Sequence, residues 1–193
     1  MSGARTLGAD YFEGIFTADA DPWDLATSEY ERRKFDRTIE ALADRRYASG
    51  LEIGCAHGVL TSRLHPLCDQ LLAIDISQTA LARAQQRVGP KSGIEWARMG
   101  FPAESPAGLF DLCVVSEVAY YWGAADLSRA AHWLADHLVP GGRVVLVHYT
   151  GETDYPCTAD EAVRALEQGT SGQFLPCLAE RHERYRLDLW ERR

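Results

Sequence analysis

Apolar residues in the segment 28–43 recur at three- to five-residue spacing, which predicts an amphipathic helix. The apolar positions are Tyr30, Phe35, Ile39 and Leu42. Ser28 and Glu31 stand three residues apart at the start of this pattern, as the two members of a capping box do. We therefore expect a helix that begins at Ser28 and ends near Ala43.

Short apolar runs then alternate with segments of helical spacing. The expected strands cover 50–54, 71–76, 93–99, 109–117 and 142–149. The expected helices cover 59–68, 77–88 and 127–138. Such alternation is typical of an α/β fold with a doubly wound, mostly parallel sheet and helices on both of its faces.

The last part of the chain has a different pattern. A helix expected over 159–168 is followed by two extended segments, from Leu175 to His182 and from Tyr185 to Glu191. We expect these two segments to form an antiparallel hairpin at the edge of the sheet. The complete prediction is therefore a seven-stranded sheet with a C-terminal antiparallel hairpin.

Length and hydropathy limit the class of protein. With 193 residues and 46% hydrophobic content, the chain is large enough for one well-buried core, and we expect a single domain over 1–193. The longest apolar runs, such as 112–115 and 144–147, have the length of a strand and are too short to cross a bilayer. Residues 1–14 lack the apolar centre of a secretory signal, so we expect a cytoplasmic protein with no membrane partner.

Charge and cysteine usage argue against two further classes. The formal net charge is −8 and the basic residues form no stripe, so we expect no nucleic-acid partner. The five cysteines are odd in number and include no close CxxC pair, which argues against disulfides and structural zinc. His132 and His137 are five residues apart and do not form a helical metal pair. We therefore expect no metal site.

A glycine-containing turn follows the first expected strand of the alternating part. Gly54 and Gly58 let the backbone approach a ligand closely, and a helix follows directly. Asp75 ends the next strand, where a carboxylate can accept hydrogen bonds from the two ribose hydroxyls of a nucleoside cofactor. The dinucleotide pattern GxGxxG is absent, which argues against NAD. A glycine turn alone is also compatible with an ordinary strand-to-helix connection.

These features resemble the class I methyltransferases that use S-adenosyl-L-methionine (SAM). The first motif of that family, an acidic residue followed by GxGxG, corresponds here to Glu52, Gly54, Cys55, Ala56 and Gly58. Ala56 stands where the family has its middle glycine. Segments 110–121 and 138–147 match further landmarks, and the resemblance covers Leu51 to Tyr149.

The resemblance implies a Rossmann-like methyltransferase fold with SAM as cofactor and S-adenosyl-L-homocysteine (SAH) as its product. It also implies a set of cofactor-binding residues, namely Trp23, Tyr30, Glu52, Gly54, Cys55, Ala56, Gly58, Asp75, Ile76, Gly100, Phe101 and Ser116. The family usually has an acidic residue after the third strand to bind the adenine amino group. This chain has Arg98 to Phe101 at that place, so adenine would rest on backbone groups and apolar contacts.

The segments YFEGIF, DPWDLATSEYERRKFD and LEIGCAHG, in this order, resemble the NodS group of nodulation-factor N-methyltransferases. Those enzymes methylate the free amine of a deacetylated chitooligosaccharide. The likeness implies that residues 1–48 supply a helix and a lid whose contact residues are Trp23 and Tyr30. It further divides the domain into a cofactor-binding core at 49–150 and a C-terminal helix and hairpin at 151–193.

Methyl transfer depends mainly on orientation, desolvation and electrostatics, and requires no metal. An amine acceptor must lose its proton, and a carboxylate can orient it and stabilise the ammonium product. Glu117, Tyr120 and His148 are the candidate catalytic residues because they lie at or just after the ends of the fourth and fifth expected strands. A structural role remains open for each of them. Glu117 can cap the next helix or contact the cofactor, Tyr120 can be an aromatic residue of the core, and His148 can be a solvated or hydrogen-bonded histidine. The side chain of His57 is expected to point away from the ligand.

Three functions follow from these observations. The first is transfer of a methyl group to a small-molecule amine such as an amino sugar. The second is a natural-product O-methyltransferase, since a fold does not determine the acceptor. The third is a SAM- or nucleotide-binding module without catalysis. The sequence gives no indication of oligomeric state.

Overall fold

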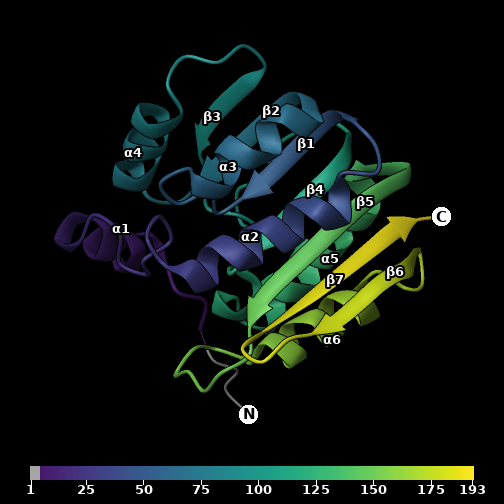
Figure 1. Ribbon diagram of the computed structural model, residues 1–193. Helices are drawn as coiled ribbons and strands as arrows, with labels where there is room; N and C mark the ends of the chain where they lie inside the picture. The colour runs from purple at the N-terminus through teal and green to yellow at the C-terminus, as the bar shows by residue number, and fades with distance from the viewer. Residues whose placement is uncertain (1–4) are drawn as a thin grey trace. The chain divides into compact units, whose positions relative to one another are not determined.

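Strands and helices alternate along the chain in the computed structural model, which describes residues 5–193 (Figure 1). The chain forms two compact units. The first unit is Gly8–Gly100, and the second unit joins the described residues up to Leu7 with Phe101–Arg193. The interpretation as one domain with parts 1–48, 49–150 and 151–193 stays a prediction.

The first unit contains three parallel strands in the order β3-β2-β1. Its elements are α1 (Ala9–Ala18), α2 (Glu29–Leu42), β1 (Tyr47–Ile53), α3 (Val59–Leu64), the 3₁₀ turn η1 (His65–Leu67), β2 (Cys68–Asp75), α4 (Gln78–Val88) and β3 (Ile94–Arg98). Parallel strands joined by helices place their carboxyl ends at one edge of the sheet, which is where open α/β sheets bind ligands.

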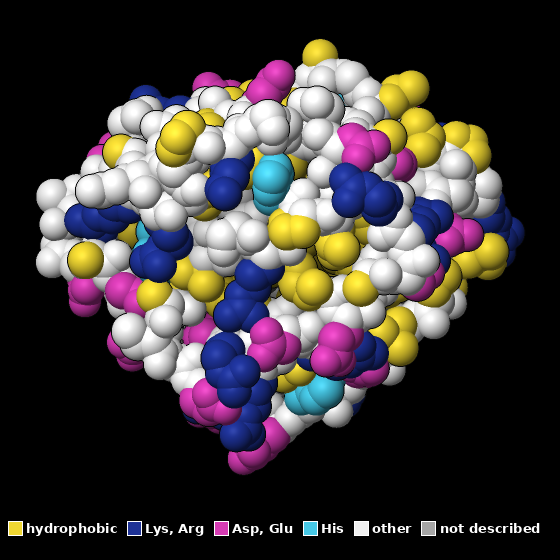
Figure 2. Space-filling view, turned by 45° about the horizontal axis from the view of Figure 1, so that its top comes forward, with side chains coloured by type: hydrophobic (Ala, Val, Ile, Leu, Met, Phe, Trp, Pro, Cys, Tyr) yellow, Lys and Arg dark blue, Asp and Glu magenta, His cyan; other side chains and the backbone are white. Residues whose placement is uncertain are grey.

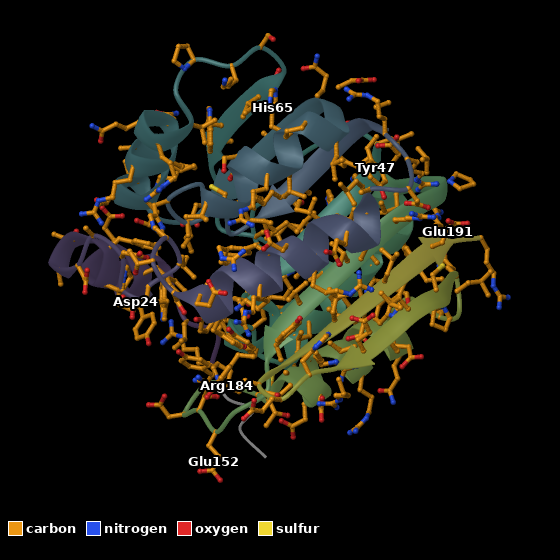
Figure 3. All side chains as sticks on the ribbon, in the orientation of Figure 1. Asp24, Tyr47, His65, Glu152, Arg184 and Glu191 are labelled. Atoms are coloured by element: carbon orange, nitrogen blue, oxygen red, sulfur yellow. The ribbon has the colours of Figure 1, made fainter. Side chains whose placement is uncertain are left out.

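Local chemistry determines where these helices begin and end. The Ser28 hydroxyl accepts a hydrogen bond from the Glu31 backbone N–H at 3.4 Å, so Ser28 caps α2 as expected. The Glu31 carboxylate, the other member of the expected capping box, instead pairs with Lys34 Nζ at 2.8 Å. The helix expected over 59–68 ends at Leu64, because Pro66 lies in the 3₁₀ turn His65–Leu67 and β2 already begins at Cys68. Tyr47 starts β1, fully buried, with its hydroxyl donating to the Leu42 carbonyl at 3.3 Å (Figure 3).

The second unit contains four strands in the order β4-β5-β7-β6. Its elements are β4 (Phe110–Ser116), η2 (Ala119–Tyr121), α5 (Ala124–His137), β5 (Leu138–Tyr149), α6 (Ala159–Gly169), β6 (Phe174–Arg181) and β7 (Tyr185–Arg192). β4 and β5 are parallel, whereas β7 pairs antiparallel with both β5 and β6. The expected C-terminal hairpin is therefore confirmed.

Two elements differ from the expectation. Helix α1 did not stand out in the sequence because Gly8 at its N-cap makes no side-chain cap and Gly14 interrupts its interior. Strand β5 begins at Leu138, where the preceding helix was expected to end, since Leu138 already pairs with Phe110 before the turn residues Pro140 to Gly142. The fold class, a mostly parallel seven-stranded α/β sheet with a C-terminal antiparallel pair, is confirmed.

The surface carries charges of both signs. On the face of the described residues drawn in Figure 2, Lys and Arg side chains are interspersed with Asp and Glu. On α2, Arg32 bridges Glu29 at 2.6 Å and Asp36 at 2.9 Å. Exposed pairs of this kind contribute only about 0–1 kcal/mol each to stability. Within residues 5–193, none of the helices has the length and apolar content needed to cross a membrane.

Candidate functional site

The glycine loop, residues 54–58, connects β1 to α3. Gly54, Ala56 and Gly58 all have positive φ angles, of 75°, 48° and 82°. The backbone N–H groups of Gly54 and Cys55 both donate to the Ile74 carbonyl, at 2.8 and 3.0 Å. The loop is therefore attached to the end of β2, and Ala56 adopts a left-handed conformation that glycine adopts more easily.

Asp75 is the carboxylate that closes the loop. Its Oδ2 accepts a hydrogen bond from the Ala56 N–H and its Oδ1 accepts one from the Ser77 N–H, both at 2.8 Å. Burial raises the pKa of Asp75 to about 6, although these backbone N–H groups act in the opposite direction. Each carboxylate oxygen accepts more than one hydrogen bond, so Asp75 retains capacity for ligand hydroxyls.

Gly58 ends the loop against the backbone of α4. A Cβ added to Gly58 would lie 3.0 Å from both the Cα and the Cβ of Ala84. Ala84 belongs to a buried cluster with Cys55, Ala73 and Leu81, against which Trp96 packs. Burial also raises the pKa of the Cys55 thiol well above its usual value, so Cys55 serves as a small packed residue.

Glu52 is buried in β1, two residues before the loop, with 2% of its surface exposed. Burial raises its pKa to about 8, against a smaller opposing effect of the Thr61 hydroxyl. Its Oε2 has no hydrogen-bond partner among residues 5–193. Burial therefore favours the protonated form of Glu52 at neutral pH.

Glu52→Gln is expected to become more stable relative to the parent chain as pH rises from 5 to 8. In that range the unfolded glutamate is ionised while the folded one keeps its proton, so the folded state binds more protons and its stability falls with pH. The difference in the free energy of unfolding between Glu52→Gln and the parent chain should grow by up to about 1.4 kcal/mol per pH unit. Urea unfolding from pH 5 to 9 measures it, with exposed Glu95→Gln as control. Equal pH dependence in both variants would contradict the assignment.

The segment between α1 and α2 contacts the glycine loop through His57. The His57 ring is buried, and its Nε2 lies 3.1 Å from Asp21 Oδ1. Its backbone carbonyl accepts a hydrogen bond from Arg87 Nε at 2.9 Å. Burial lowers the pKa of His57, which favours the neutral ring. The side chain that was expected to point away from the ligand therefore faces Asp21, in the segment between α1 and α2.

The remaining cofactor candidates have varied surroundings. Trp23 packs edge-on against buried Phe16, and Lys34 Nζ lies 5.2 Å above the Tyr30 ring. The Ile76 carbonyl accepts a hydrogen bond from Arg98 Nε at 3.2 Å.

Three candidates lie at the ends of elements or in a packed cluster. Phe101 is buried against Trp122 and Trp133 and belongs to an aromatic core. Gly100 is the last residue of the first unit, and Ser116 ends β4 beside Val147 of β5. Their cofactor roles stay predictions.

Glu117 follows β4 in the second unit with a positive φ angle of 58°, an uncommon conformation for a residue other than glycine. Its N–H donates to the Val147 carbonyl at 2.8 Å. Its Oε2 accepts hydrogen bonds from the Tyr149 N–H, at 2.8 Å, and from the Tyr120 hydroxyl. The carboxylate is thus held in one orientation by groups from β5 and η2.

Tyr120 belongs to an aromatic cluster with Tyr121 and Tyr155. The Tyr155 ring stacks on Tyr120 at 5.3 Å and meets Tyr121 edge-on at 4.7 Å. Burial raises the pKa of Tyr120 well above its usual value, and the neighbouring Glu117 raises it further, so the hydroxyl keeps its proton and donates. His148 is fully buried, and its Nε2 accepts a hydrogen bond from the Ala119 N–H at 3.2 Å. This matches the hydrogen-bonded alternative for His148.

Three residues of these arrangements had no assigned role in the sequence. They are Glu13 of α1, which accepts a hydrogen bond from the Ser77 hydroxyl at 2.6 Å, Asp21 beside His57, and Tyr155 in the aromatic cluster. Glu13 and Tyr155 meet their partners across long stretches of chain, so no local spacing identifies them. Asp21 belongs to the DPW segment, which was the available signal.

Known proteins resemble this chain along most of its length. The crystal structure of the N-methyltransferase NodS from Bradyrhizobium japonicum WM9, in complex with SAH, has a TM-score of 0.80 and 26% identity, and the match covers 96% of this chain and 99% of that one. The nodulation protein S of Sinorhizobium fredii (strain NBRC 101917 / NGR234) is 36% identical over 130 residues, which are 66% of this chain and 60% of that protein. An uncharacterised methyltransferase of Mycobacterium tuberculosis is 30% identical over 116 residues, 60% of this chain and 57% of that protein.

The chain thus spans less than two thirds of the curated relative's length. The family description "Nodulation protein S (NodS)" matches residues 14–148, which is more than half of the chain. The chain therefore belongs to the nodulation protein S (NodS) family.

Proposed function

We propose that this protein is a SAM-dependent N-methyltransferase that acts on a small-molecule amine, such as an amino sugar. The observation that carries the proposal is the buried Asp75 carboxylate, bonded to the Ala56 amide inside the glycine loop. The related NodS structure with SAH, whose title names an N-methyltransferase, supports both the cofactor and the type of acceptor.

The first unit offers groups that fit SAM. Asp75 can accept hydrogen bonds from the ribose hydroxyls, and the positive φ angles of Gly54 and Gly58 open the backbone to the cofactor. The buried Glu52 oxygen without a partner among the described residues offers a further polar contact. When bound, SAM supplies an electrophilic methyl group on a sulfonium. The remaining cofactor residues are proposed on the resemblance alone. They are Trp23, Tyr30, Cys55, Ala56, Ile76, Gly100, Phe101 and Ser116.

The second unit offers a carboxylate for the acceptor. Glu117 is held by Tyr120 and by the Tyr149 amide, so its charge has a fixed position from which to orient an amine and stabilise the ammonium product. We assign Tyr120 to the support of that carboxylate. In this proposal His148 positions η2 through the Ala119 amide and is not the proton acceptor.

Two measurements test the proposed function. Isothermal titration with SAM, SAH and NAD should show binding of the first two and not of the third; binding of NAD alone would overturn the cofactor. Transfer of labelled methyl should then occur to amino sugars and other small amines. Transfer only to hydroxyl compounds would replace the proposal with an O-methyltransferase. Binding of SAM without methyl transfer to amines or to hydroxyl compounds would indicate a SAM-binding module without catalysis.

Glu117→Gln is expected to reduce kcat for the amine by about 10- to 100-fold, because the substitution removes the charge that stabilises the ammonium. The Kd for SAH should change by less than about twofold, since the glutamine oxygen can still accept the Tyr149 N–H. Glu152→Gln, an exposed carboxylate of the same unit (Figure 3), is the control. Unchanged kcat in Glu117→Gln would reduce Glu117 to a structural role.

The proposal includes a cytoplasmic location and a small-molecule acceptor as the binding partner. All five cysteines are free thiols, as suits a reducing compartment. We also propose that nucleic acid is not a partner, because the net charge is −8.

A further inference from the structure

Glu13 joins α1 to the beginning of α4. Its Oε2 accepts a hydrogen bond from the Ser77 hydroxyl at 2.6 Å and one from the Thr79 N–H at 3.3 Å. Its Oε1 accepts from the Thr79 hydroxyl. Ser77 and Thr79 are 64 and 66 residues away in the sequence, so this one carboxylate makes a long-range connection. Figure 1 shows α1 beside α4.

Two further polar contacts attach the N-terminal segment, residues 9–24, to the same region. Arg83 of α4 donates to the Asp19 carbonyl at 2.7 Å, just after α1 ends. Asp21 then meets His57 of the glycine loop at 3.1 Å. The N-terminal segment is thus hydrogen-bonded to α4 at its middle and contacts the loop near its end.

Two of these contacts lie next to the hydrogen-bond partners of Asp75. Ser77, which donates its hydroxyl to Glu13, donates its backbone N–H to Asp75. Ala56, whose N–H donates to the other oxygen of Asp75, precedes His57. The N-terminal segment therefore contacts Ser77 directly and contacts the residue that follows Ala56.

The chemistry of Glu13 suits a permanent attachment. The hydroxyls of Ser77 and Thr79 lower the pKa of Glu13 to about 2, so the side chain is a carboxylate throughout the neutral range. It lies at the N-terminus of an eleven-residue helix, where the free N–H groups and the helix dipole favour a negative charge. Glutamine at position 13 would fill the same space without the negative charge.

We propose that Glu13 is a positioning residue for cofactor binding, which holds α1 on α4 so that the N-terminal segment stays closed beside Asp75 and the glycine loop. This inference rests on the proposed function, since SAM is the ligand that the closed segment retains. When a protein is competent to bind in only a fraction of its population, its apparent affinity falls by that fraction. Opening of the segment should therefore weaken cofactor binding and leave kcat at saturating SAM unchanged.

The test compares Glu13→Ala, Glu13→Gln and Thr79→Val with Asp10→Asn, an exposed acid on the same helix. SAH titration should show binding about tenfold weaker in Glu13→Ala, with a smaller loss in Thr79→Val. Glu13→Gln should recover part of the affinity. The double variant Glu13→Ala/Thr79→Val should lose little more than Glu13→Ala alone, because both substitutions break the same attachment. Asp10→Asn should bind as the parent chain does.

Two readouts separate positioning from a general effect on folding. Hydrogen exchange should become faster in α1 and residues 19–24 of Glu13→Ala while exchange in β1 and β2 stays slow. KM for SAM should rise with kcat unchanged. Equal SAH affinity in Glu13→Ala and the parent chain, or faster exchange throughout the first unit, would overturn the inference. Failure of the parent chain to bind SAH would instead overturn the proposed function.

Discussion

Gly58→Ala is expected to destabilise the protein by about 2–5 kcal/mol. A left-handed backbone costs an alanine about 1–2 kcal/mol, and Gly58 has a φ angle of 82°. The new Cβ would also lie 3.0 Å from the Cα and Cβ of Ala84, so the loop or α4 must move, at a typical further cost of about 1–3 kcal/mol. Chemical denaturation measures the loss, and SAM titration should show weaker binding because the loop backbone shifts.

Gly89→Ala separates the two causes. Gly89 ends α4 with a φ angle of 68° and a ψ angle of −175°, a conformation almost restricted to glycine, yet an added Cβ there meets no atom within 4 Å. Gly89→Ala should therefore lose about 1–3 kcal/mol through conformation alone and keep its affinity for SAM. If Gly58→Ala also keeps its affinity for SAM, close packing of the loop on α4 is not what requires glycine at position 58.

Asp75→Asn is expected to weaken SAM binding by about 1–3 kcal/mol, or roughly 5- to 150-fold. Asparagine offers one acceptor oxygen, whereas the carboxylate accepts from Ala56 and Ser77 through two different oxygens. One backbone N–H therefore loses its partner, the loop shifts, and the ribose hydroxyls lose a charged acceptor. Titration with SAH measures the affinity, and urea unfolding should show a stability loss of about 1 kcal/mol.

Asp69→Asn is the matched control for Asp75→Asn. Asp69 belongs to the same strand but is exposed and pairs with exposed Arg46 at 2.7 Å, so its loss should cost less than about 1 kcal/mol and leave affinity unchanged. A second arm varies pH. Because the pKa of Asp75 is about 6, SAH affinity of the parent chain should fall as pH drops below 6 and the carboxylate takes up a proton. Constant affinity between pH 5 and 7 would argue against a ribose contact through the carboxylate.

The sequence was sufficient for elements whose signals are local. Period and length identified every strand of the sheet, and the order of strand, glycine turn, helix and Asp75 located the loop. Errors arose where one residue overrides its neighbours. Pro66 ends α3 within an otherwise helical apolar pattern, and Leu138 joins a strand although the residues after it are typical of a turn.

The candidate site was less predictable because its side chains meet across the chain. The position of Asp75 could be predicted because it depends on the end of one strand, whereas Glu13 contacts residues 64 and 66 positions away. The left-handed Glu117 and the stacking of Tyr155 on Tyr120 likewise have no signature in a sequence pattern. Burial raises the pKa of Glu52 to about 8. This burial depends on the folded structure and not on the residues next to Glu52 in the sequence.

The two hydrogen bonds of Asp75 with the backbone also bear on how a ligand binds. Since Ala56 and Ser77 already hold the carboxylate, the loop is preorganised, and its ordering entropy is lost during folding and not during association. A ligand that uses Asp75 therefore meets an acceptor of fixed direction, which favours molecules with two neighbouring hydroxyls at the matching angle. Selectivity for a ribose over its deoxy analogues should follow from this rigidity, because the deoxy analogue would leave an oriented acceptor without its donor.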